Sequence, residues 1–166
     1  MERKLGFAPV FNTDSRILIL GSFPSVKSRE IDFYYGNKQN RFWKMLCGYF
    51  GEEIPETIIG KKEFLFRRGI ALWDMAISCK IEGSADANIK DVELADLNEV
   101  LSHAHIEQIL LNGTLAYDLF MREYSNIQIP YSKMPSTSPA NPRYQKEIWY
   151  KTLNDTFGKE QKNNME

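Results

Sequence analysis

Short apolar runs alternate along this chain with longer segments whose apolar residues recur at helical spacing. The short runs have the length and branching of buried strands. They predict strands at Arg16–Leu20, Ile70–Trp73, Gln108–Leu111 and a shorter Ile127–Ile129. The spacing between them predicts helices over residues 40–50, 55–68 and 94–101, a helix around Ala116–Phe120, and a final helix from about Pro142 to Phe157.

This alternation of strands and helices is typical of a parallel sheet covered on both faces. The sequence therefore predicts an α/β fold, a three-layer α/β/α arrangement with a central four-stranded parallel sheet. Residues 1–15 form an irregular lead-in, and residues 79–88 and 134–141 are too polar or too rich in Pro and Ser for regular structure. We expect one domain over residues 1–157, followed by a charged, disordered tail at 158–166.

Polar residues follow several of the predicted strands. Gly21, Asp74 and Asn112 each come at or directly after a strand end, and the loop Met134–Asn141 follows the last strand. Ligands of open α/β sheets bind at the carboxyl ends of the strands. The segment Gly21–Trp43 adds aromatic rings, amides and backbone N–H groups, which suit a planar, hydrogen-bonding ligand such as a nucleobase.

Composition narrows the class of protein. At 166 residues and 43% hydrophobic, the chain can bury a core of its own. No apolar run approaches the roughly 20 residues of a membrane span, and Met1–Lys4 leads into no signal region, so we expect a cytoplasmic protein with no membrane contact. We also expect a monomer. The net charge of −1 argues against bulk coating of nucleic acid but allows a local grip on a few phosphates.

The sequence contains few residues arranged to bind a metal or cofactor. Cys47 and Cys79 are too few for a disulfide framework or an iron–sulfur site, and we expect reduced core thiols. His103 and His105 have no carboxylate or thiol at a ligand spacing. We therefore expect neither a metal nor a cofactor.

Six ordered sequence blocks carry a specific resemblance over roughly residues 5–155. They are Leu20-Gly21-Ser22-Phe23-Pro24-Ser25 with Tyr34-Tyr35, Asn40-Arg41-Phe42-Trp43, Gly69-Ile70-Ala71-Leu72-Trp73-Asp74, Gly83-Ser84-Ala85-Asp86, Leu111-Asn112-Gly113, and Pro135-Ser136-Thr137-Ser138-Pro139-Ala140-Asn141. In these blocks the chain resembles the uracil-DNA glycosylase superfamily, and within it the hypoxanthine (deoxyinosine) DNA glycosylase branch. The resemblance implies a repair enzyme that flips a deaminated base out of DNA and hydrolyses its bond to deoxyribose.

One position departs from the superfamily pattern. The mismatch-specific uracil glycosylases carry a catalytic asparagine in the first block, and an ungapped match places it on Phe23. The resemblance to the hypoxanthine branch gives the water-positioning role to Asn40 instead. An alternative interpretation of Asn40 is a helix N-cap, and one residue can do both.

The resemblance also implies base-binding residues. Tyr35 corresponds to a ring that stacks on the flipped base, or is simply a packed tyrosine. The backbone N–H groups of Ser22 and Phe23 are candidates to bind the carbonyl oxygen of the base. Asp74 takes the place of a base-reading asparagine, and its carboxylate would accept from the N1–H of hypoxanthine; the alternative is that it caps the following turn.

Further residues are expected to contact DNA. Ser136 and Ser138 would hold backbone phosphates, and Ala140 and Asn141 would lie near the hole left by the flipped base. Asn112 would contact phosphate or hold the turn with Gly113. Arg143 and Lys146 are either additional phosphate contacts or a solvated face, and the roles of Ser84 and Asp86 stay open.

The sequence thus predicts a monofunctional DNA glycosylase that acts on single- or double-stranded DNA containing a deaminated base, most plausibly hypoxanthine. No lysine lies within the blocks as a Schiff-base nucleophile, so lyase activity is not expected. One alternative is a uracil or mismatch-uracil glycosylase on the same fold. Another is a non-catalytic module that binds damaged DNA or nucleotides, and a third, a flavodoxin-like enzyme, lacks a Gly-rich phosphate loop.

Overall fold

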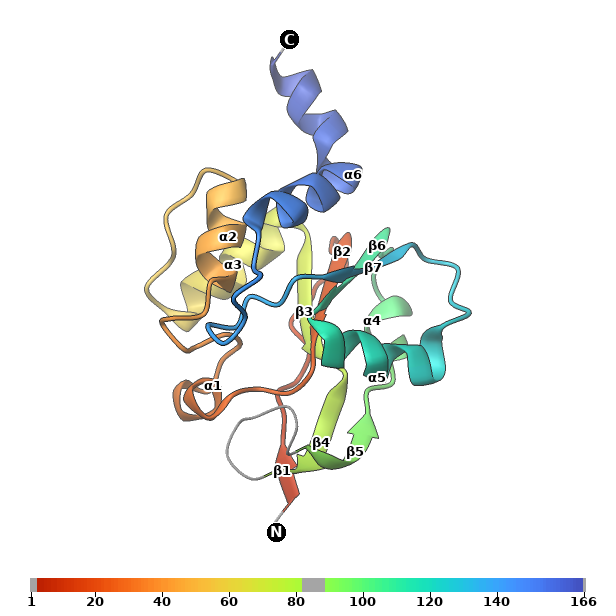
Figure 1. Ribbon diagram of the computed structural model, residues 1–166. Helices are drawn as coiled ribbons and strands as arrows, with labels where there is room; N and C mark the ends of the chain where they lie inside the picture. The colour runs from red at the N-terminus through yellow and green to blue at the C-terminus, as the bar shows by residue number, and fades with distance from the viewer. Residues whose placement is uncertain (1–2, 82–88, 166) are drawn as a thin grey trace.

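The computed structural model describes residues 3–81 and 89–165, and the elements of these residues form three layers (Figure 1). In chain order they are β1 (Arg3–Leu5), β2 (Ile17–Gly21), α1 (Val26–Ile31), α2 (Phe42–Tyr49), α3 (Ile58–Arg68), β3 (Ile70–Asp74), β4 (Ala76–Lys80), β5 (Lys90–Leu94), α4 (Asn98–Leu101), β6 (Gln108–Asn112), α5 (Thr114–Tyr124), β7 (Tyr131–Met134) and α6 (Lys146–Met165). Helices α2, α3 and α6 lie on one side of the main sheet, and α4 and α5 lie on the other.

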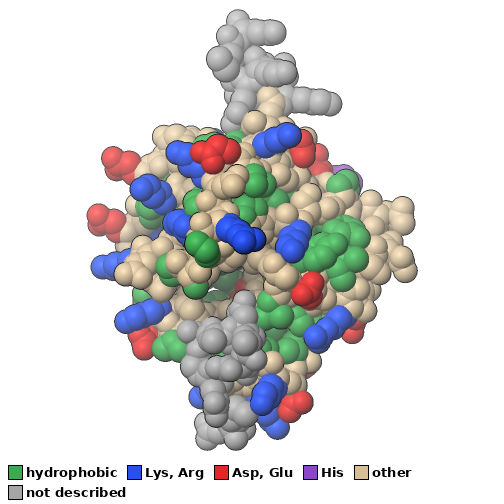
Figure 2. Space-filling view, viewed as in Figure 1, with side chains coloured by type: hydrophobic (Ala, Val, Ile, Leu, Met, Phe, Trp, Pro, Cys, Tyr) green, Lys and Arg blue, Asp and Glu red, His purple; other side chains and the backbone are tan. Residues whose placement is uncertain are grey.

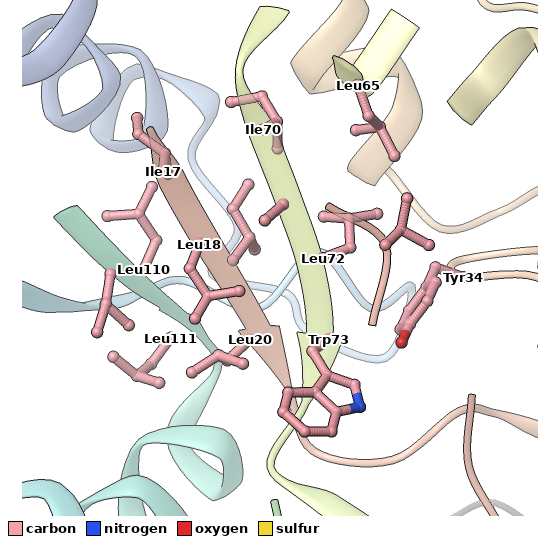
Figure 3. Close-up of a cluster of buried hydrophobic side chains, with 14 of the residues drawn as sticks. Ile17, Leu18, Leu20, Tyr34, Leu65, Ile70, Leu72, Trp73, Leu110 and Leu111 are labelled. Carbon is pink, nitrogen blue, oxygen red and sulfur yellow. The ribbon is translucent and has the colours of Figure 1, made fainter. Parts of the chain in front are cut away.

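The main sheet has the strand order β3-β2-β6-β7, and each neighbouring pair is parallel. Every residue of β2 and β3 is buried, because helices cover both faces of the sheet. Figure 3 shows the leucine and isoleucine side chains of β2, β3 and β6 packed together in this core. The predicted α/β/α fold with a four-stranded parallel sheet is confirmed.

The fourth strand was predicted at the wrong place. Ile127–Ile129 lies in a turn region, and the strand that pairs with β6 is β7, Tyr131–Met134. The pairing begins where the N–H of Ile109 donates to the carbonyl of Pro130. Ile127 and Ile129 instead pack against the core as partly buried side chains. As a result, the chain leaves β7 directly into residues 135–141 at the carboxyl edge of the sheet.

A second sheet, of order β1-β4-β5, was not predicted. Its antiparallel strands include part of the expected irregular lead-in and part of the expected polar loop, and β5 also takes up Leu94, which shortens the expected helix to α4. The hydroxyl of Ser78 on β4 joins the strands: it accepts from Arg3 and donates to Glu93 (2.8 and 2.9 Å). Such pairing depends on residues far apart in sequence, so local periodicity does not reveal it.

Two helices also differ from the prediction. The six-residue α1 was missed; its N-terminus is capped by the Ser25 side chain, which accepts from the N–H of Ser28. Helix α6 begins at Lys146 rather than near Pro142, and it extends through most of the segment 158–166 that was expected to be a disordered tail. None of the helices among the described residues is long and apolar enough to cross a membrane.

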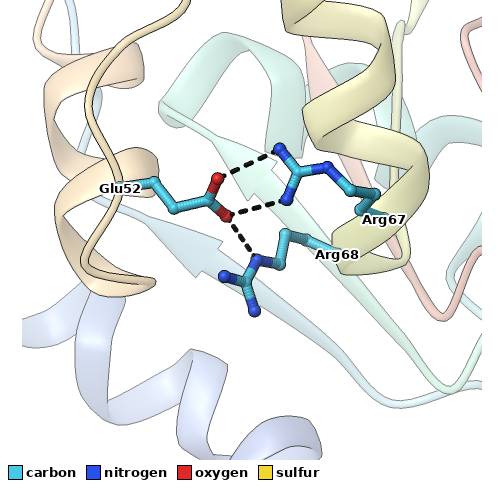
Figure 4. Close-up of polar contacts among 3 residues, drawn as sticks. All are labelled: Glu52, Arg67 and Arg68. Carbon is cyan, nitrogen blue, oxygen red and sulfur yellow. Dashed lines mark hydrogen bonds and ion pairs between the residues drawn. The ribbon is translucent and has the colours of Figure 1, made fainter.

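Helices α2 and α3 are joined by a small ion-pair cluster (Figure 4). The Glu52 carboxylate accepts from Arg67 (3.0 and 3.2 Å) and from Arg68 (2.6 Å). The hydrogen bond from Arg67 makes the largest contribution to a lowered pKa of Glu52. The cluster ties Glu52, in the connection after α2, to the C-terminal end of α3.

Candidate active site

A cavity of about 1000 Å³ opens at the carboxyl ends of the main-sheet strands. Ten of the residues named from the sequence line it: Ser22, Phe23, Tyr35, Asn40, Asp74, Asn112, Ser136, Ser138, Ala140 and Asn141. Lys146 is not among the residues that line it. Figure 2 shows the hollow on this face of the molecule, with Lys and Arg side chains gathered above it.

The sheet register explains why these residues meet. Gly21 at the end of β2 lies beside Asp74 at the end of β3, and Asn112 at the end of β6 lies beside Met134 at the end of β7. Because all these strands are parallel, the segments that follow them emerge at the same edge. The loop of residues 135–141 therefore faces the segment of residues 22–40 across the cavity.

Tyr35 lines the cavity from a strained backbone position. Its ring stacks on Phe42 with a centroid separation of 4.0 Å, and its φ of 54° is uncommon for a residue with a side chain. Its buried hydroxyl has no hydrogen-bond partner among the described residues. Burial and, next, the charge of Asp74 raise the pKa of this hydroxyl. Tyr34 also lines the cavity, but it is almost fully buried and its hydroxyl donates to the carbonyl of Ala8 (2.8 Å).

Asp74 is a buried carboxyl group in the same cavity. It is 5% exposed, and within the described part of the chain its Oδ2 atom has no hydrogen-bond partner. Burial raises the pKa of Asp74 to about 7. The next two backbone N–H groups, of Met75 and Ala76, donate to the carbonyls of Gly21 and Ser22 (2.8 and 3.0 Å). These bonds take up the first two N–H groups after Asp74, so neither of them is capped by its carboxylate.

Asn40 lies two residues before α2 and lines the cavity. Its Oδ1 atom accepts from the N–H of Phe42 (2.9 Å), but the N-cap position of α2 is Arg41 and not Asn40. A carbonyl oxygen has two lone pairs, so this bond leaves one of them able to hold water. Asn40 is therefore not the N-cap of α2, and its oxygen remains a candidate to hold water.

Asn112 does not face solvent as a free amide. Its Nδ2 donates to Oγ1 of Thr137, and its Oδ1 accepts from the N–H of Thr137 (both 3.0 Å). Thr137 is 1% exposed and was not singled out in the sequence. The Asn112 side chain therefore holds the loop after β7, which favours a structural role over phosphate contact.

The rest of this loop is also tied down from within the protein. Ser136 Oγ accepts from the N–H of Ser138 (3.1 Å), and Ser138 Oγ accepts from the N–H of Ala140 (3.2 Å). Asn141 donates from Nδ2 to the carbonyl of Ser136 (2.9 Å). Because a hydroxyl can both accept and donate, both serines retain a proton that can be donated to an anion.

Cationic side chains accompany the loop. Lys133, which the sequence analysis did not name because it precedes the last block, lines the cavity together with Arg143. Lys146 lies at the start of α6 near the ring of Tyr150 (6.0 Å). Arg41 was also missed, although it lies within a block; its guanidinium contacts the loop directly.

The structure contains no ligand-rich cluster for a metal within residues 3–81 and 89–165: no group of three or more His, Cys, Asp or Glu side chains is close enough. Cys47 and Cys79 are both free and buried, as expected for core thiols, and burial raises the pKa of Cys47 to about 11. Ser84 and Asp86 lie outside the described residues.

Comparisons with known proteins agree with this geometry. The family model of the uracil DNA glycosylase superfamily matches residues 8–157. A protein of Methanosarcina barkeri named hypoxanthine DNA glycosylase is 36% identical over 113 residues, which cover 67% of this chain and 72% of that protein. A protein of the same name from Methanosarcina acetivorans is 35% identical over 149 residues, covering 86% and 91%. A solution NMR structure from Methanosarcina acetivorans superimposes with a TM-score of 0.80 at 30% identity, covering 94% of this chain and 97% of that one.

Proposed function

This chain belongs to the uracil DNA glycosylase superfamily and is a DNA glycosylase, and on that premise we propose that it excises hypoxanthine from DNA. The observation that carries the choice of base is Asp74, a buried carboxyl group with an unpartnered oxygen in the same cavity as Asn40 and Tyr35. A buried polar atom without a partner in the free protein is satisfied when the right ligand supplies one.

The chemistry of Asp74 distinguishes hypoxanthine from adenine. An ionised carboxylate accepts the N1–H of hypoxanthine, whereas adenine presents a lone pair at N1 and would leave two acceptors facing each other. An unmatched buried polar group costs about 1–3 kcal/mol, which is enough for useful discrimination. Phe23 and Ser22 follow β2 at the cavity wall, where a backbone N–H would meet the base's carbonyl oxygen.

Tyr35 would stack on the flipped base. One face of its ring already packs on Phe42, so the ring is held rigid and can offer its other face to the cavity. Stacking on an aromatic side chain contributes about 1–3 kcal/mol per base and is indifferent to its identity. Tyr35 therefore contributes affinity in this proposal, and Asp74 contributes selectivity.

Asn40 would direct the hydrolytic water. The bond from C1′ to the base nitrogen breaks with its electron pair going to the base, and the water oxygen bonds to the resulting cation-like C1′. The attacking water gives up a proton to solvent, and the released base takes one up from solvent. Such a sugar needs little activation of the nucleophile, so an amide oxygen that only orients water is sufficient. The departing base gathers negative charge, which backbone N–H dipoles at the cavity wall would stabilise.

The DNA backbone would lie along the loop of residues 135–141. The serine hydroxyls at 136 and 138 can donate to phosphate oxygens, and Lys133 and Arg143 supply positive charge at the cavity. Ala140 and Asn141 would face the vacated position in the duplex. We further propose that residues 1–157 act as one monomeric, cytoplasmic glycosylase domain.

A panel of oligonucleotides tests the proposal. Single- and double-stranded DNA carrying one hypoxanthine, uracil, xanthine or adenine would be incubated with the protein and assayed for alkali-labile breaks. We expect hypoxanthine to be released fastest and adenine not at all. Faster release of uracil would favour the uracil-glycosylase alternative, and lesion binding without any release would favour the non-catalytic module.

A further inference from the structure

Arg41 joins the two sides of the cavity. It lies between Asn40 and Phe42 in sequence, and its backbone N–H donates to the carbonyl of Thr137 (3.1 Å). Its side-chain Nε approaches the same carbonyl oxygen (3.4 Å). Thr137 is the buried residue that Asn112 also holds, so Arg41 and Asn112 meet at one point of the loop.

The guanidinium group of Arg41 reaches further along the same loop. Nη2 donates to the carbonyl of Ser138 and to the carbonyl of Asn141 (2.9 Å). Cζ of the group lies over the Tyr144 ring, 4.3 Å from the ring centroid. The Arg41 side chain therefore bonds to the carbonyl groups of three loop residues and also packs on Tyr144, which follows the loop.

The direction of these bonds argues for positioning rather than DNA binding. An arginine beside a nucleic-acid site usually turns its donors toward phosphates. The Arg41 donors point instead at backbone carbonyls of the protein, from the segment that carries the candidate catalytic amide. The Phe42 N–H that follows is bonded to Asn40, and the Phe42 ring supports Tyr35.

We propose that Arg41 is a positioning residue that holds the DNA-contacting loop of residues 135–141 in register with Asn40 and Tyr35. The expected effect of Arg41 on catalysis rests on the proposed function. The positioning role requires arginine specifically, because the planar guanidinium offers several donors in a fixed fork and can stack on an aromatic ring. Lysine keeps the positive charge but cannot serve these carbonyls and the Tyr144 ring together.

The test compares Arg41→Lys with wild type and with Arg122→Lys, a matched change at an exposed residue of α5. Single-turnover release of hypoxanthine is measured at saturating protein, together with affinity for a duplex containing an uncleavable abasic analogue. Hydrogen exchange is followed for the backbone of residues 135–141. For Arg41→Lys we expect release slowed about tenfold or more at saturation, weaker DNA binding and faster exchange in the loop. Arg122→Lys should match wild type in all three.

The outcomes separate this inference from the proposed function. If wild type releases no base from any lesion, the proposed function fails, and the exchange rates alone then decide whether Arg41 holds the loop. Weaker binding with an unchanged saturated rate would overturn the link to Asn40, as would unchanged loop exchange. If Arg41→Lys does not fold, Tyr144→Leu takes its place: it removes the stacked ring but not the carbonyl bonds, and it should slow release and loosen the loop in the same direction.

Discussion

Asp74 and Tyr35 direct their polar atoms at the same point beside Gly21. A side-chain carbon at Gly21 would lie 2.5 Å from Oδ1 of Asp74 and 3.1 Å from the Tyr35 hydroxyl oxygen. Within the described part of the chain, the Tyr35 hydroxyl and Oδ2 of Asp74 lack hydrogen-bond partners. The side chain of Asn112 lies close enough to Tyr35 to offset part of the rise in the pKa of the Tyr35 hydroxyl. The hydrogen bonds of the Asn112 oxygen and nitrogen, however, go to Thr137 and not to Tyr35. The glycine hydrogen thus leaves room for two uncompensated polar groups, which is costly for folding and useful for binding a base.

Gly21→Ala should impair catalysis more than folding. The new methyl group would overlap the Asp74 carboxyl, which must shift, and overpacking of this kind costs about 1–3 kcal/mol of stability. We expect a folded variant with a large loss of hypoxanthine release, measured by single-turnover kinetics and thermal unfolding. Full activity would show that the position of Asp74 is not critical.

Asp74 should make activity and stability respond oppositely to pH. Its folded-state pKa of about 7 lies above the unfolded value of about 3.9, so between these limits the folded state binds more protons than the unfolded one. Stability at this site therefore falls as pH rises from about 4 to 7. Release of hypoxanthine should rise over the upper part of that range, as the accepting carboxylate forms.

Asp74→Asn provides the check on both effects. The amide does not ionise, so the variant should gain thermal stability relative to wild type on going from pH 5 to pH 8. Its ratio of hypoxanthine to uracil release should also change, because an amide offers a donor as well as an acceptor. Equal pH dependence of unfolding in the two proteins would contradict a raised pKa, and an unchanged ratio would remove Asp74 from base selection.

Asn40→Ala should slow single-turnover release by more than about tenfold, because the water is no longer oriented. The same change removes the acceptor for the Phe42 N–H, at a cost of about 1 kcal/mol in stability. Asn40→Ser separates the two losses, since serine can still accept from the Phe42 N–H but is too short to replace the amide at the sugar. A serine variant as active as wild type would leave Asn40 with only the structural role of holding the Phe42 N–H.

Asn112→Ala should weaken DNA binding by loosening the loop after β7. It leaves the buried N–H of Thr137 without its acceptor, which costs about 1–3 kcal/mol in unfolding free energy. Chemical denaturation and equilibrium titration with lesion-containing DNA would measure the two losses. If binding weakens while stability is unchanged, Asn112 contacts the DNA itself, contrary to the role inferred from the structure.

Much of the site could be predicted from the sequence because its residues follow strand ends. Buried parallel strands are continuous apolar runs, so the sequence places Gly21 and Asp74 at strand ends, and the register of the structure sets them side by side. The one strand of the main sheet that was predicted at the wrong place is β7, because the apolar residues Ile127 and Ile129 before it have the spacing of a short strand. Apolar residues of a turn that packs on the core cannot be distinguished from a short strand by periodicity.

The sequence by itself determined the layered fold, the edge at which the site lies and ten of the residues that line it. Only the tertiary structure decided that Asn112 holds Thr137, that Arg41 turns inward to the loop, and that Asp74 is left without a partner. The reason is physical: burial of an apolar run is encoded locally, whereas the pairing and desolvation of a polar group depend on which distant residues the fold places around it.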